Sequence, residues 1–219
     1  MTRAVPVLLL VAAAMLAASP FMIDAAPPEA TMGLVQKIFY VHLPSAMIFM
    51  VSSVMCGVAS AVYLMGGRSP KADRIAVAAA ELAIVFGLIT LVTGPLWGRK
   101  AWGVWWVWDA RLTSTLVMWL LYWSFTLLRR FGGPGSENLS AGVGLFGMAL
   151  VPFVYWSVNV WRTLHPQTSV VPTLPASMGI PLWWDVAAFG CLFAALFALR
   201  TRVERLRTDL DAALADADE

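Results

Sequence analysis

Charged residues are scarce in this sequence: Asp, Glu, Lys and Arg make up 13% of its 219 residues, against about 25% in an ordinary soluble domain. Cysteine is scarce too, and Cys56 and Cys191 both fall inside apolar segments, where we expect them to pack rather than to form a disulfide. The sequence contains no C-x-x-C-H haem-attachment motif and no G-x-x-x-x-G-K-[ST] phosphate loop. It is therefore not a c-type cytochrome and has no nucleotide site of that kind. The net charge of +2 gives no support to nucleic-acid binding.

Apolar residues are abundant instead: they make up 60% of the chain and gather in long blocks. A helix of about 20 residues spans the roughly 30 Å hydrocarbon core of a bilayer. We therefore predict an all-α integral membrane protein, with a six-transmembrane-helix bundle in residues 1–199 and a charged cytoplasmic C-terminal tail in residues 200–219. The predicted spans are Ala4–Ile23, Ser45–Met65, Ile75–Trp97, Leu112–Leu128, Leu139–Trp161 and Ile180–Leu199.

The first block has an alternative interpretation as a signal peptide. Arg3 precedes it, and the small residues Ala17, Ala18 and Ser19 lie near its end. The apolar run continues through Phe21–Ile23, which is long for a signal core. We therefore predict a retained helix.

Lysine and arginine predict the orientation of the bundle. Two thirds of them fall on one side of a six-helix plan: Arg3, Arg68, Lys71, Arg74, Arg129, Arg130, Arg200, Arg202, Arg205 and Arg207. The positive-inside rule places this side, and both termini, in the cytoplasm. Loops 24–44, 99–111 and 162–179 then face the opposite compartment. Arg99, Lys100 and Arg111 lie in one of these outer loops against the rule, which suggests that a ligand requires them there.

The outer loop between the third and fourth spans contains WGVWWVWDARLTS. Eight tryptophans map to the outer side: Trp97, Trp102, Trp105, Trp106, Trp108, Trp161, Trp183 and Trp184. An aromatic belt is the alternative explanation, but a belt occupies both membrane interfaces. We predict a local aromatic platform for a flat ligand. If the loop is helical, Trp102, Trp105 and Trp106 share one face, followed by Asp109, while Trp108 points elsewhere.

The chain has only two histidines, and both map to the outer side of the membrane. His42 lies in YVHLPSAM, just before the second span, and His165 lies in WRTLHPQTSVVP, just after the fifth. Either one alone is more simply explained as a polar side chain among lipid headgroups. Together they flank the tryptophan loop, and neutral imidazoles are good ligands for iron. We predict that His42 and His165 are axial ligands of a non-covalently and transiently bound haem b.

Basic side chains border the same surface. Arg99, Arg111 and Arg162 are predicted to bind the haem propionates, because arginine pairs with carboxylates through two hydrogen bonds. For Asp109, an ion pair with Arg111 that orients the loop is an equally good interpretation.

Two acidic residues fall inside predicted spans, where charge is costly. Glu81 is close enough to the cytoplasmic end of its span to extend its side chain to the interface, and contact with a partner helix is the alternative. We expect Asp185, beside Trp183 and Trp184, to lie at the outer interface.

The segment PLWGRKAWGVWWVWDARLTS closely resembles the WWD signature of the haem-handling membrane proteins of cytochrome c maturation, specifically the haem exporter protein C (CcmC) family. The resemblance extends to IFYVHLPSAM and WRTLHP and, with the six-helix plan, covers nearly the whole chain. It implies that His42 and His165 are the outer histidines that flank the WWD domain. The core of that domain is then Trp102, Trp105, Trp106, Trp108 and Asp109.

The resemblance also implies a non-enzymatic role in the bacterial inner membrane, in which haem on the periplasmic face is presented to a periplasmic haem chaperone of the CcmE type. The ABC transporter subunits CcmA and CcmB and the small membrane protein CcmD are the implied partners. One alternative is a b-type cytochrome or quinol-reactive membrane anchor of a redox enzyme, although such proteins usually hold haem between histidines inside the bundle. A haem-free scaffold for other subunits is a third possibility.

Overall fold

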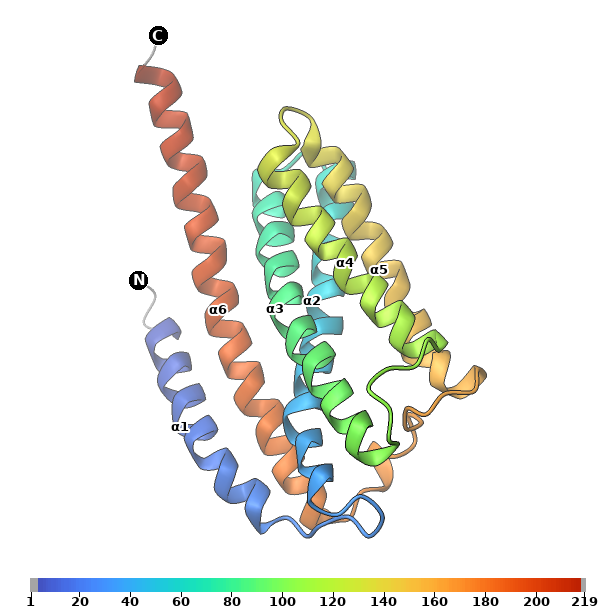
Figure 1. Ribbon diagram of the computed structural model, residues 1–219. Helices are drawn as coiled ribbons and strands as arrows, with labels where there is room; N and C mark the ends of the chain where they lie inside the picture. Colours follow the sequence, from blue (N-terminus) through green and yellow to red (C-terminus); the bar gives the residue numbers. More distant parts are fainter. Residues whose placement is uncertain (1–3, 218–219) are drawn as a thin grey trace.

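The structure, a computed structural model, describes residues 4–217, and Arg3 of the orientation argument lies outside them. Within this part of the chain the secondary structure is helical (Figure 1). The helices are α1 (Ala4–Ala25), η1 (Leu34–Ile38), α2 (Phe39–Met65), α3 (Pro70–Ala101), α4 (Ala110–Phe131), α5 (Ser136–Val160), η2 (Val171–Thr173) and α6 (Ala176–Ala217). Five of the six α-helices are long and apolar enough to cross a membrane, and α4 is the exception. The predicted all-α membrane fold is confirmed.

Helices α2, α3, α4 and α5 form the central bundle, and α6 packs along α2 and α3. Helix α1 packs against α6, so these two helices lie to one side of the bundle (Figure 1). Large buried side chains from three of the helices fill the bundle: Phe49 of α2, Phe86 of α3, and Met118, Tyr122 and Phe125 of α4. Small residues bring helices together: a methyl group on Gly144 of α5 would lie 2.6 Å from Ser60 Oγ of α2.

Helix ends differ from the predicted spans in a way that affects the histidines. Helix α2 begins at Phe39, directly after η1, rather than near Ser45. His42 therefore lies inside α2 and not before it. Helix α6 continues from the apolar segment to Ala217 without a break, and the division of the chain at residue 199 remains a prediction.

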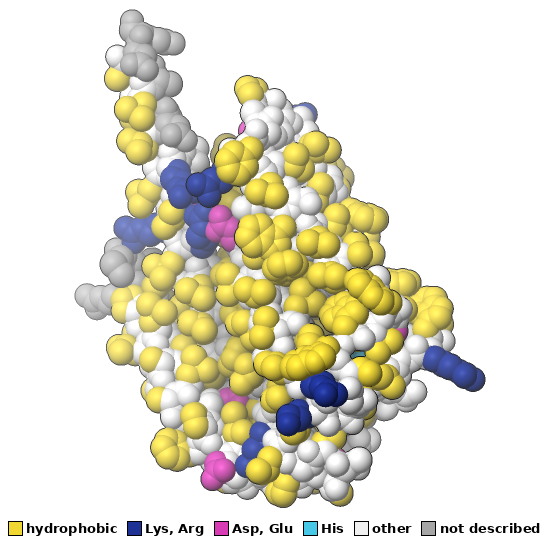
Figure 2. All heavy atoms as spheres, viewed as in Figure 1, with side chains coloured by type: hydrophobic (Ala, Val, Ile, Leu, Met, Phe, Trp, Pro, Cys, Tyr) yellow, Lys and Arg dark blue, Asp and Glu magenta, His cyan; other side chains and the backbone are white. Residues whose placement is uncertain are grey.

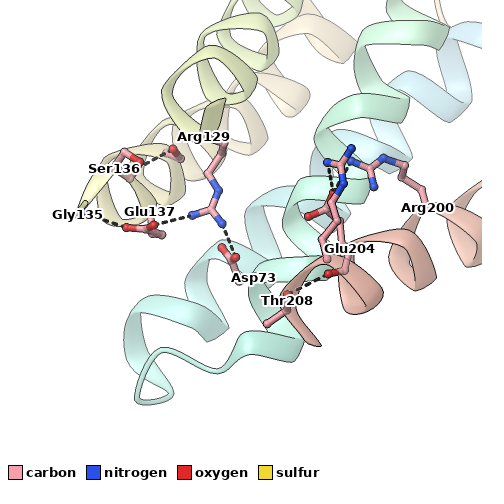
Figure 3. A network of polar contacts seen from close by, with 10 residues as sticks. Asp73, Arg129, Gly135, Ser136, Glu137, Arg200, Glu204 and Thr208 are labelled. Atoms are coloured by element: carbon pink, nitrogen blue, oxygen red, sulfur yellow. Dashed lines mark hydrogen bonds and ion pairs between the residues drawn. The ribbon is translucent and has the colours of Figure 1, made fainter. Parts of the chain in front are cut away.

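The two ends of the bundle differ in charge. We call the end that holds the α2–α3 and α4–α5 loops the arginine end, and the end that holds segments 26–38, 102–109 and 161–175 the tryptophan end. At the arginine end, Arg129 of α4 lies 2.5 Å from Asp73 of α3 and 3.8 Å from Glu137 of α5 (Figure 3). These ion pairs tie three helices together.

A second group of ion pairs at the arginine end includes Glu81. Arg200 of α6 donates to both carboxylate oxygens of Glu81 on α3, with Nη2 2.6 Å from Oε1, and also pairs with Glu204. Glu204 accepts in turn from Arg207, 3.1 Å away. Glu81 therefore makes the partner-helix contact that was the alternative prediction, and the partner is α6.

Asp185 does not lie at the outer interface, and that expectation was wrong. Its side chain is 1% exposed and accepts a hydrogen bond from Ser19 of α1. The indole N–H of the neighbouring Trp184 donates to the Met15 carbonyl, 3.1 Å away. The two contacts join α6 to α1, and the donor on the adjacent helix satisfies one of the two oxygens of this buried carboxyl group.

Candidate functional site

The two histidines come together at the tryptophan end. His42 lies near the start of α2 and is 8% exposed, while His165 lies in the segment between α5 and α6. Their ring centroids are 6.4 Å apart, and the ring planes are inclined by 44°. Residues 123 positions apart in the chain are thus brought side by side at the end of the packed helices α2 and α5.

Hydrogen bonds fix which nitrogen of each imidazole faces its neighbours. His42 Nδ1 lies 2.9 Å from Thr93 Oγ1, and the Thr93 hydroxyl donates its own hydrogen to the Ile89 carbonyl, 2.7 Å away. With its hydrogen given to Ile89, the Thr93 hydroxyl accepts from His42, and this arrangement places the imidazole proton on Nδ1. His165 Nδ1 lies 2.9 Å from the Pro166 carbonyl, which can only accept. Both rings therefore leave an unprotonated Nε2 free to bind a metal.

His165 is held in its neutral form. Burial lowers its pKa from the ordinary value of 6.5 to about 4, and the positive charge of Arg111 acts in the same direction. A neutral imidazole is the form that binds iron, so protons do not compete for this ligand near neutral pH.

A small cavity, here the histidine cavity, lies beside both rings and encloses about 70 Å³. Its walls come from α2, α3, α4 and α5 and are mainly apolar, with Arg111 as the charged residue among them. The lining includes Phe49, Met50, Trp97, Trp102, Trp106, Met118 and Val154. Figure 2 shows only a trace of histidine surface among hydrophobic side chains on the face that it presents.

Trp97, which the sequence placed on the outer side without selecting it as a site residue, is a member of this site. Its ring meets His42 edge-on, with centroids 5.9 Å apart, and stacks on Trp102 at 6.4 Å. It lies one helical turn beyond Thr93 on the same face of α3, so both contact His42. The i, i+4 spacing of Thr93 and Trp97 can be read from the sequence, but that both residues contact His42 follows only from the packing of α2 against α3.

The tryptophan loop is not helical, and the predicted shared face of Trp102, Trp105 and Trp106 is wrong. Residues 103–109 are irregular, and Gly103 has a φ of 79°, a conformation that suits glycine. Trp102 and Trp106 line the histidine cavity, but Trp105 and Trp108 are 58% and 74% exposed. Because the backbone of the loop is irregular, its tryptophans point alternately into the cavity and out of it. A helix would have placed Trp102, Trp105 and Trp106 on one face.

Asp109 and Arg111 have separate partners rather than each other. Asp109 caps α4 by accepting from the Leu112 backbone N–H at 2.8 Å, and its second oxygen accepts from the Thr163 hydroxyl. Thr163 Oγ1 also accepts from the His165 backbone N–H at 3.1 Å. Asp109 thus connects the start of α4 to the segment that carries His165.

The remaining predicted arginines differ in position. Arg111 lines the histidine cavity and donates to the backbone carbonyls of Val154 and Tyr155 on α5. Arg99 donates to the Gly103 carbonyl at 2.5 Å and so holds the base of the tryptophan loop. Arg162 is exposed and does not line the cavity. The structure thus brings one of the three arginines to the histidines.

Comparisons with known proteins agree with this arrangement. The family model described as "CcmC: Heme exporter protein C" matches residues 1–216. The chain is similar to the Heme exporter protein C of Bradyrhizobium diazoefficiens, with 36% identity over 94% of this chain and 80% of the relative. It is also similar to the Escherichia coli (strain K12) protein of the same name, with 37% identity over 81% of this chain and 73% of the relative. A Marchantia polymorpha protein named as a putative cytochrome c biosynthesis ccmC-like mitochondrial protein is 33% identical over 81% of this chain and 77% of its own length.

A family model that covers almost the whole chain, together with relatives of 36–37% identity that match most of it, leaves one assignment for this helical membrane protein. It belongs to the haem exporter protein C family, whose relatives are named for haem export and cytochrome c biosynthesis.

Proposed function

We propose that this chain binds haem b non-covalently and transiently at the tryptophan end, with the iron between His42 and His165, and presents it to an acceptor. The observation that carries the proposal is the facing pair of imidazoles, each with its Nδ1 engaged and its Nε2 free. Engaging one imidazole nitrogen in a hydrogen bond is how proteins orient a histidine toward a metal.

The spacing of the rings supports axial ligation. A metal–imidazole bond is about 2 Å long, so two such bonds and the radii of two rings separate the centroids by about 6 Å. The observed 6.4 Å agrees with this value. The 44° between the ring planes is compatible with two ligands that arrive from different elements, α2 and the α5–α6 segment.

The remaining residues suit a flat apolar ring with carboxylate substituents. Trp97, Trp102 and Trp106 supply aromatic surface, and Arg111 supplies a cation inside the histidine cavity. Arg99 and Arg162 would meet a propionate only at the outer rim. Sites for ligands of this size usually measure about 300–1,000 Å³, against the 70 Å³ enclosed here. Haem entry therefore requires the tryptophan loop, which carries Trp102 and Trp106, to move outward.

The proposal includes a cellular setting. The arginine end and both termini face the cytoplasm, in accordance with the positive-inside rule, and the site opens to the periplasm from a bacterial inner membrane. The acceptor is a periplasmic haem chaperone of the CcmE type, and the ABC transporter subunits CcmA and CcmB and the small protein CcmD are the partners. The chain itself catalyses no reaction.

The absorption spectrum of the purified protein tests this function. We expect a six-coordinate low-spin haem spectrum in the wild type, and five-coordinate spectra in His42→Ala and His165→Ala, which free imidazole partly restores. Gln167→Ala is a matched control, because Gln167 is exposed two residues beyond His165. Wild-type spectra in both histidine variants would refute the ligand assignment. Haem that stays bound and cycles reversibly between oxidation states without an acceptor would favour the b-type cytochrome alternative.

A further inference from the structure

A second hollow lies at the arginine end, on the other side of the membrane span from the histidine cavity. It is a groove of about 770 Å³ between α1, α3 and α6, which we call the basic groove. Its lining includes Val5, Lys71, Arg74, Ile75, Phe197, Leu199, Arg202, Arg205 and Asp209. None of these residues takes part in the site proposed above.

The charges of the basic groove are unbalanced. Four of its lining residues are cations, and Asp209 is the one acid among them. Asp209 lies 3.6 Å from Arg205, and both side chains are largely exposed. Within residues 4–217, Lys71, Arg74 and Arg202 have no ion pair of their own. A groove with this surplus of positive charge favours an anion.

The cleft on the opposite side of α6 provides a contrast within the same molecule. It is also lined by arginines, including Arg129, Arg200 and Arg207. There Arg129, Arg200 and Arg207 are paired with carboxylates, as Figure 3 shows for Arg129 and Arg200, while Arg130 has no ion pair among the described side chains. Unpaired cations are therefore concentrated in the basic groove, whereas most of the arginines in the opposite cleft are neutralised by carboxylates.

The start of α3 adds to the attraction for an anion. Lys71 lies in the first turn of this 32-residue helix, where the helix dipole disfavours a cation, and the N-cap residue Ser69 makes no side-chain capping bond. The one acid of this turn, Asp73, is paired with Arg129, so an anion beside Lys71 would complement the lysine and the N–H groups of the first turn.

The groove is apolar directly next to these cations. Val5 of α1, Ile75 of α3 and Phe197 of α6 line it from three helices. Phe197 stacks on Phe193, one turn further into the bundle, with ring centroids 5.9 Å apart. A ligand that fits both parts has an anionic head and an apolar tail. A free inorganic anion would leave the apolar part of the groove unused.

We propose that the basic groove binds an anionic phospholipid, with its phosphate among Lys71, Arg74 and Arg202 and an acyl chain against Ile75 and Phe197. Basic pockets between transmembrane helices are known to bind such headgroups. The lipid fills the space between α1 and the α3–α6 pair at the arginine end and so holds α1 against the bundle.

The test compares lipid retention in two charge-matched double variants. Arg74→Gln/Arg202→Gln removes two cations from the basic groove, and Arg130→Gln/Arg207→Gln removes two from the opposite cleft. Each protein is reconstituted in nanodiscs of phosphatidylglycerol and phosphatidylcholine, extracted in mild detergent, and examined by native mass spectrometry for bound phosphatidylglycerol. At about 1 kcal/mol for each basic residue, we expect roughly 30-fold weaker retention in the groove variant and little change in the control.

A second measurement separates the lipid from free phosphate. Thermal unfolding is followed in phosphatidylcholine nanodiscs, with either phosphatidylglycerol or inorganic phosphate added. We expect phosphatidylglycerol, and not phosphate, to raise the unfolding temperature of the wild type and the control, and to have a smaller effect on the groove variant. Equal loss of lipid in both double variants, or equal stabilisation by phosphate alone, would overturn the proposal. A groove variant that unfolds at the wild-type temperature in phosphatidylcholine is correctly folded, so its lipid result is interpretable.

Discussion

At the scale of single residues, Thr93 determines the tautomer of His42. Its hydroxyl is committed as a donor to the Ile89 carbonyl and can therefore only accept from the imidazole. This pair of hydrogen bonds holds Nδ1 against α3 and leaves Nε2, the nitrogen proposed to bind iron, away from it. Without the Thr93 hydroxyl, the His42 ring would stay in place, but its proton would no longer be held on Nδ1.

We expect Thr93→Val to weaken haem binding by roughly 10- to 100-fold, the usual effect of losing the hydrogen-bond partner of a metal-binding histidine. The reduction potential of the bound haem should rise as well, because an imidazole that loses its acceptor is a weaker electron donor. Haem titration and redox potentiometry measure the two effects. Thr93→Ser retains the hydroxyl and should behave as the wild type. If the serine variant is as impaired as the valine variant, the methyl group and not the hydrogen bond is responsible.

The sequence predicts some of these residues and not others. His42 and His165 could be paired because the chain has only two histidines and both map to one side of the membrane. The contacts of Thr93 and Trp97 with His42 could not be predicted from the sequence, because they depend on which face of α3 meets α2. Asp109 was ambiguous for the same reason: its partner, Thr163, comes from another part of the chain.

At the scale of helices, the contact between α1 and α6 depends on few polar groups. Only 11% of the membrane-spanning window of α1 is buried inside the molecule, the smallest share among the five spans. The hydrogen bond from Ser19 to Asp185 joins two buried side chains in this contact. A buried carboxyl group that loses its donor is left unsatisfied.

We expect Ser19→Ala to lower the free energy of unfolding by about 1–3 kcal/mol, the cost of leaving a buried acceptor without its donor. Asp185→Asn keeps an acceptor for Ser19 and should be milder than Asp185→Ala. Unfolding in mixed detergent micelles gives these values. Ser124→Ala is the matched control, since the Ser124 hydroxyl is exposed and bonds only to its own helix. If Ser124→Ala lowers the free energy of unfolding as much as Ser19→Ala does, the interhelical hydrogen bond contributes no more to stability than a bond within one helix.

Apolar block length predicts the helices well but not their ends. Each predicted span falls largely within one observed helix, because burial in lipid requires continuous backbone hydrogen bonding. Outside the apolar core that requirement is lifted. Apolar blocks therefore do not predict where a helix ends. Helix α2 starts at Phe39, before its apolar block, while the tryptophan loop is irregular although its spacing also suits a helix. The two ends of the tryptophan loop are held by local hydrogen bonds, from Arg99 to the Gly103 carbonyl and from the Leu112 N–H to Asp109, which apolar periodicity does not reveal.

At the scale of the whole molecule, the two ends are chemically distinct: one carries paired and unpaired arginines, the other aromatic side chains and both histidines. This polarity predicts a single orientation in the membrane.

Single cysteines introduced after Cys56→Ala and Cys191→Ala test that orientation. With a membrane-impermeant maleimide applied to intact spheroplasts, we expect Gln167→Cys to be labelled at once. Pro134→Cys, in the α4–α5 loop, should react only after the membrane is permeabilised. Labelling of Pro134→Cys alone would reverse the assignment, and equal labelling of both would contradict a fixed orientation.

The small volume of the histidine cavity has a kinetic consequence. Because about 70 Å³ is too small for a porphyrin, the proposed function implies a unimolecular step in which the tryptophan loop moves away from the imidazoles before haem transfer. The rate of haem transfer should then level off as the acceptor concentration increases, at the opening rate of the loop. The family member would act as a gated donor whose exchange rate is set by its own motion rather than by the frequency of collisions.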